Sequence, residues 1–73
     1  MQANHRFDLH ALTRFFTDHC QPGRGNPLSL LSAAQIVSDL PAEQLLALRA
    51  ALSGAALENT LAQLIEQRAA THA

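Results

Sequence analysis

Residues 41–70 read PAEQLLALRAALSGAALENTLAQLIEQRAA, and this stretch decides the fold. Leucine and alanine fill so many of its positions that few polar side chains remain to meet water. A helix that is apolar nearly all round has to be buried, and a chain of 73 residues has little interior in which to bury one. The stretch therefore predicts helices that need cover, which a second copy of the chain or another protein would supply.

The pair Ser53-Gly54 lies in the middle of this stretch and poses the main structural question. Glycine inside a helix costs about 1 kcal/mol relative to alanine. At about 100° per residue, the leucines before and after the pair would lie on nearly opposite faces of a straight helix. A turn at Gly54 in the left-handed conformation lets both rows face one core. We favour this broken, hairpin form, in which the two rows are Leu45, Leu48, Leu52 and Leu57, Leu61, Leu64.

An unbroken helix over residues 41–70 is the alternative that the sequence leaves open. It also has a usable apolar stripe, with spacings of four and three residues. Such a long helix would demand a partner along its length. The stripe consists of Leu46, Ala50, Ser53, Leu57, Leu61 and Leu64.

The residues near the amino terminus predict a helix over about 9–20. Asp8 can cap this helix, with Phe7 and Leu12 forming a hydrophobic staple around the cap. Apolar residues recur at spacings of three and four and form one face of the helix. That face consists of Leu9, Leu12, Phe15, Phe16 and His19 or Cys20.

A loop follows at residues 21–27, because two glycines and two prolines crowd this short stretch. Asn26-Pro27 is one helix start, since proline at the first helical position gives up a donor that would be unpaired anyway. Ser32 is a second start, because Ser-Ala-Ala-Gln matches a capping box. We favour an irregular or short helical turn at residues 27–31, followed by a helix at about 33–39.

The break between the second and third helices is set by Asp39-Leu40-Pro41, because the residue before a proline avoids the helical region. Strands have almost no support, since β-branched and aromatic residues are scarce and no alternation of period two occurs. The sequence thus predicts an all-α, dimeric protein, a small bundle of about four short helices in a single domain over residues 1–73. The expected elements are a helix at about 9–20, a loop at 21–27 and helices at about 33–39, 41–53 and 55–70.

The residues that could carry chemistry do not form a pattern. Cys20 is the only cysteine, so an internal disulfide is impossible. His19 and Cys20 are adjacent and point about 100° apart on a helix, which is unsuitable for a catalytic dyad. The four histidines and the cysteine lack the spacing of three or four that a helix needs to hold one ion. We therefore predict no enzyme, no cofactor and no metal site at His5, His10, His19, His72 or Cys20.

The charge is nearly balanced, with five arginines, no lysine and six acidic residues. This balance disfavours a strongly basic nucleic-acid binder. Arg6, His10 and Arg14 nevertheless recur every four residues, and Arg24 follows in the loop, so these four are candidate nucleic-acid contacts. They support the alternative function, a small dimeric DNA-binding transcriptional regulator.

The amino-terminal residues lack the apolar core of a signal peptide, and no apolar run approaches the length of a membrane span. We expect a cytoplasmic protein with no membrane partner. The favoured function is a protein–protein interaction module of the adaptor, docking-domain, chaperone or inhibitor type, which buries leucine-rich helix faces against a partner or a second copy. The predicted interface consists of Leu46, Ala50, Leu57, Leu61, Leu64 and Ile65, and the identity of the partner stays open.

Overall fold

The computed structural model describes residues 8–71, which form four α-helices and no strand. The all-α class and the small helical bundle are thereby confirmed. Phe7, one half of the predicted staple, lies outside the described residues. The helices are α1 (Leu9–His19), α2 (Pro27–Asp39), α3 (Ala42–Ala51) and α4 (Asn59–Thr71).

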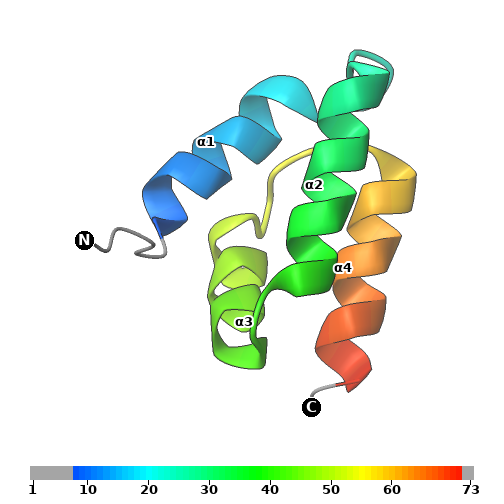
Figure 1. Ribbon diagram of the computed structural model, residues 1–73. Coiled ribbons are helices and arrows are strands. Elements are labelled where there is room, and N and C mark those ends of the chain that lie inside the picture. The colour runs from blue at the N-terminus through cyan, green and yellow to red at the C-terminus, as the bar shows by residue number, and fades with distance from the viewer. Residues whose placement is uncertain (1–7, 72–73) are drawn as a thin grey trace, which may run out of the picture.

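Helix α4 packs against α2 and α3, while α1 packs against α3 and, over a smaller contact, against α2. In Figure 1, α2 and α4 run side by side in the same direction, α3 runs the opposite way, and α1 is inclined to them. Two parallel neighbours cannot be joined by a tight turn. The chain therefore returns through α3 and the segment that follows it before α4 begins.

One cluster of apolar side chains holds the bundle together, and every helix contributes to it. Phe16, Leu45 and Leu48 are the largest of its fully buried side chains. Leu61 and Ile65 of α4 face the same cluster as the leucines of α3, so both rows of the leucine-rich stretch share one core. The remaining buried members are Cys20, Ala33, Val37 and Leu52.

The start of α1 follows from its capping residue. The Asp8 carboxylate accepts a hydrogen bond from the backbone N–H of Ala11 at 3.0 Å, which satisfies one of the orphan donors of the first turn. The predicted apolar face packs toward the core: Phe16 and Cys20 are buried, and Leu9, Leu12 and Phe15 are partly buried against the cluster.

Helix α2 begins earlier than the sequence predicts, so the expectation of a turn at residues 27–31 and a helix at about 33–39 is wrong. The Asn26 side chain accepts a hydrogen bond from the backbone N–H of Leu28 at 2.8 Å, and Pro27 occupies the first helical position. Ser32 lies exposed within the helix and does not start one. The early start is favoured because it puts Leu30, which is partly buried against the core, on the same helix as the buried Ala33 and Val37.

Helix α3 ends in a left-handed turn at Gly54, whose φ is +88°. The backbone N–H of Leu52 still donates to the carbonyl oxygen of Leu48 at 2.9 Å, and that of Ala55 donates to Leu52 at 2.9 Å. The structure thus has the broken form of residues 41–70 and not the unbroken helix.

Helix α4 begins at Asn59, later than the expected start at about residue 55. The backbone N–H of Glu58 donates to the carbonyl oxygen of Cys20 at 2.8 Å, which ties the end of the connection to the end of α1. The Glu58 carboxylate accepts from the backbone N–H of Leu61 at 3.0 Å and so caps α4. This contact with a distant part of the chain explains why residues 55–58 stay out of the helix.

None of the helices formed by residues 8–71 combines the length and the apolar character needed to cross a membrane.

Candidate interaction surface

The predicted interface residues do not form one surface. Leu61 and Ile65 are each only 3 % exposed and belong to the core, so a partner cannot reach them in the folded chain. Leu57 and Leu64 are partly buried against the same core. Only Leu46 and Ala50 of this set lie on the exposed side of α3. The apolar stripe of α4 therefore serves mainly to close the fold.

The exposed side of α3 is bordered by an ion pair that joins it to α4. The Arg49 guanidinium donates to both carboxylate oxygens of Glu66, with the shortest N–O distance at 2.8 Å. This hydrogen bond, helped by the positive charge of Arg49, lowers the pKa of the Glu66 carboxyl below its ordinary value. Both side chains are solvent-exposed, so the pair adds little stability. It leaves a small hollow of about 270 Å³ beside Leu46.

The most exposed large apolar side chains of the described residues lie on α2, at positions where the sequence predicted a turn. Leu28 is 73 % exposed and Leu31 is 68 % exposed, against 41 % for Leu46. They recur with three polar residues at spacings of three and four along one side of the helix. We call this side the α2 face; it consists of Leu28, Leu31, Ser32, Gln35 and Asp39.

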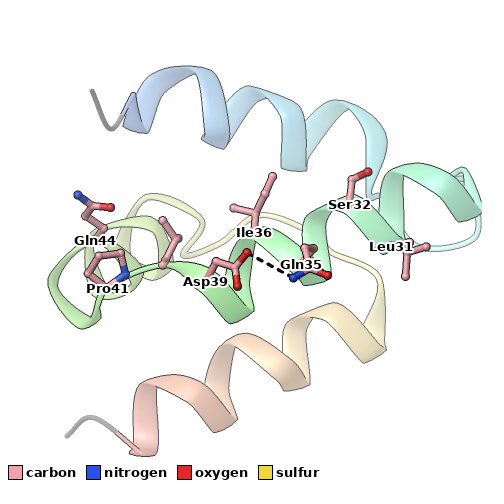
Figure 2. A pocket seen from close by; sticks show the side chains of 8 residues that line it. Leu31, Ser32, Gln35, Ile36, Asp39, Pro41 and Gln44 are labelled. Carbon is pink, nitrogen blue, oxygen red and sulfur yellow. Dashed lines mark hydrogen bonds between the residues drawn. The ribbon is translucent and has the colours of Figure 1, made fainter. Parts of the chain in front are cut away.

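A groove runs beside the α2 face where α2 meets the start of α3 (Figure 2). We call it the α2–α3 groove; its volume is about 620 Å³. Its apolar lining comes from both helices and the junction between them, and its polar lining lies mostly on α2. The lining residues are Leu31, Ser32, Gln35, Ile36, Asp39, Leu40, Pro41 and Gln44.

A second hollow lies on the other side of Leu31, between α2 and α4, with a volume of about 330 Å³. Leu31 thus stands between two depressions and projects as a ridge. Exposed apolar side chains gathered beside a groove are typical of protein interaction sites, whereas single scattered ones are not informative.

The carboxyl end of the α2 face is acidic. The Asp39 side chain accepts a hydrogen bond from the Gln35 amide at 3.3 Å, and within the described residues it makes no ion pair. The last turn of α2 contains no basic residue, although the carbonyl end of a helix favours a cation. This end of the surface is therefore suited to a positively charged group from outside.

The candidate nucleic-acid contacts are only partly placed. Arg6 lies outside the described residues, while His10 and Arg14 are exposed one turn apart on α1. Arg14 lies 4.0 Å from Asp18, which offsets its charge, and Arg24 is exposed in the loop before α2. Residues 8–71 contain four arginines and six acidic residues, so this part of the chain gathers no strongly basic surface.

Potential ligands for a metal are dispersed: in the stretch from Asp8 to Thr71, no three histidine, cysteine or acidic side chains lie together. His19 is exposed and stacks near Phe15, with ring centroids 5.4 Å apart, whereas Cys20 is buried. Burial raises the pKa of the Cys20 thiol above its ordinary value, and the charge of Glu58 raises it further. The thiol is therefore less reactive than a free cysteine, because the thiolate is the nucleophile.

We expect Cys20 to react with a thiol reagent at least about a hundredfold more slowly in the native chain than in urea, because access requires an opening of about 3 kcal/mol or more. The rate is measured with a chromogenic disulfide reagent at neutral pH, with N-acetylcysteine as the reference for an unprotected thiol. A native rate within tenfold of the unfolded rate would contradict the burial of this side chain.

Comparison with protein-family models, with curated proteins and with solved structures finds no match to this chain.

Proposed function

We propose that this chain is a small helical protein–protein interaction module that binds through the α2 face and the α2–α3 groove. The observation that carries the proposal is the pair Leu28 and Leu31, both more than two-thirds exposed on consecutive turns of one helix beside an apolar groove. Leaving two such side chains in water forgoes about 1.5–3 kcal/mol each of burial free energy. A partner that covers these two leucines recovers this free energy.

The chemistry of the surface supports this class of function. A groove of this size with an apolar lining and a polar edge fits the side chains of a partner helix. Adaptors, docking domains, chaperones and small inhibitors all bind in this way, and the proposal assigns no reaction to the chain. It takes the cytoplasm as its setting, as the sequence predicts.

The proposal moves the interface away from the carboxy-terminal helix. Leu61 and Ile65 are needed for the core, so α4 has less apolar surface to offer than the sequence predicts. Leu46 and Ala50 remain exposed on α3 and form a smaller secondary candidate. Binding to DNA receives less support than protein binding, because Arg14 faces Asp18 and acidic residues outnumber arginines between positions 8 and 71.

A photo-crosslinking residue placed at position 31 tests the proposal in the native cell. We expect a covalent adduct with a polypeptide, because the Leu31 side chain projects into the proposed interface. The matched control carries the same crosslinker at His10, which is exposed on α1. No polypeptide adduct at position 31, or equal adducts at both positions, would argue against the α2 face as a binding surface.

A further inference from the structure

We propose that the occupant of the α2 face is a second copy of this chain, bound with its α2 antiparallel across a two-fold axis. The inference rests on the proposed function, since it names the partner of the same surface. It is carried by a division of the α2 face into two halves that complement each other in shape and in charge.

The halves differ in shape. The amino-terminal half bears the ridge formed by Leu28 and Leu31, and the α2–α3 groove extends from the flank of Leu31 along the carboxy-terminal half to Pro41 and Gln44. Figure 2 shows Asp39, Pro41 and Gln44 at the end of the groove farther from Leu31. A convex half and a concave half on one helix are what a self-complementary contact requires, because the same patch serves both copies.

A two-fold axis that crosses the α2 face between Ser32 and Gln35 brings each ridge to the other copy's groove. Leu28 and Asp39 lie at nearly equal distances on either side of that axis, about 16 Å apart along the helix at 1.5 Å per residue. In this arrangement Leu28 of one copy lies near Asp39 of the other. Leu31, next to the axis, lies near Ile36 of the second copy, at the wall of the groove.

The charges favour the same arrangement. Arg24 precedes the amino end of α2 and is exposed, and the first turn of the helix contains no acidic residue. Asp39 ends the helix, and the last turn contains no basic residue. Antiparallel pairing therefore sets Arg24 and the positive end of one helix dipole beside Asp39 and the negative end of the other.

A parallel pairing would set like charges and like dipole ends together, and it would place ridge against ridge. The antiparallel contact also closes after two copies, so it produces a dimer and not a filament. The contact consists of one helix pair with its flanking residues. The area that it buries is at the lower end of the range for stable interfaces. We therefore expect a dissociation constant of about 10–100 µM.

Sedimentation velocity on the full chain from about 5 to 500 µM tests the association, because this range spans the expected dissociation constant. We expect a shift from monomer to dimer in this range. Leu31→Ser should leave the circular dichroism spectrum unchanged, since this side chain is exposed, and weaken the dimer at least about thirtyfold, since two leucines leave the interface. Leu46→Ser removes the exposed leucine of the secondary candidate on α3, which lies outside the antiparallel α2 contact, and should therefore leave the dimer intact.

A charge exchange tests the arrangement. Arg24→Asp and Asp39→Arg should each weaken the dimer about tenfold, because each change acts at two symmetry-related sites. Neither change threatens the monomer, since an acid near the amino end and a base near the carboxyl end of α2 both suit its dipole. The double variant R24D/D39R restores opposite charges across the axis and should regain most of the affinity.

Three outcomes overturn the proposal: a monomer throughout the concentration range, a double variant as weak as the weaker single variant, or a Leu46→Ser variant as disruptive as Leu31→Ser. A purified monomer combined with a crosslink from position 31 to a different protein removes the second copy and keeps the proposed function. A dimer that is weakened by each single charge variant and regained in R24D/D39R supports both the proposed function and the second copy as its partner.

Discussion

Leu61→Asp should unfold the chain. The leucine side chain is 3 % exposed in the core, and its replacement puts a carboxylate into a cluster that, among residues 8–71, contains no charged side chain. The new charge would also lie close to Glu58, whose carboxylate caps the backbone N–H of residue 61 at 3.0 Å. The combined loss of burial and gain of an unpaired charge exceeds about 4 kcal/mol. A domain of this size rarely has more than about 3–5 kcal/mol to lose.

Far-UV circular dichroism at 25 °C and urea titration measure the effect. The matched control is Leu28→Asp, which makes the same chemical change at a side chain that is 73 % exposed. We expect the control to keep the helical spectrum and a urea midpoint close to that of the parent chain. A folded Leu61→Asp variant with an unchanged urea midpoint would show that Leu61 of α4 is not part of the buried core.

This pair of variants also separates the two sets of leucines that the sequence could not tell apart. With Leu28 on α2 and Leu61 on α4, both leucines are apolar positions of helices, and helical phase alone does not say which of them is buried. Which of them is covered depends on how α2, α3 and α4 cross, and that depends on contacts between residues far apart in the chain. Phase counting therefore predicted too much interface on α4 and none on α2.

The element boundaries that sequence could predict depend on a few adjacent residues. Asp8 caps α1, Pro41 separates α2 from α3, and Gly54 ends the leucine row of α3, each through local backbone chemistry. Each of these signals is complete within a short window of sequence.

The boundaries that sequence missed depend on competition or on distant partners. Two start signals, at Asn26 and Ser32, lie within one short segment, and the first is used because the longer helix adds core contacts. The start of α4 is delayed by a hydrogen bond between Glu58 and Cys20, which no local pattern reveals. The turn that the sequence predicts at residues 27–31 gives Leu28 and Leu31 no common helix face, so the sequence does not predict the α2 face.

Gly54→Val should destabilise the fold by about 2 kcal/mol, the second largest effect that we predict. The cause is the backbone alone: φ at this position is +88°, whereas a Cβ built there meets no atom within 4 Å. A β-branched residue tolerates the left-handed region least. Gly54→Asn should cost less than the valine variant, since asparagine visits this region more readily.

The measurement is the urea midpoint of each variant at constant protein concentration, with Ser53→Ala as the neighbouring control that leaves the turn intact.

The substitution at residue 54 also affects the architecture of the chain. If residue 54 takes helical angles, α3 can continue into the next helix, and the leucines at 57, 61 and 64 turn away from the leucines of α3. The chain could then bury them only against another copy, so a fraction of Gly54→Val should sediment as an extended, exchanged dimer. That dimer should resist Leu31→Ser, because its interface is the opened core and not the α2 face. Equal midpoints for Gly54→Val and Ser53→Ala would mean that the left-handed turn does not hold the two leucine rows on one core.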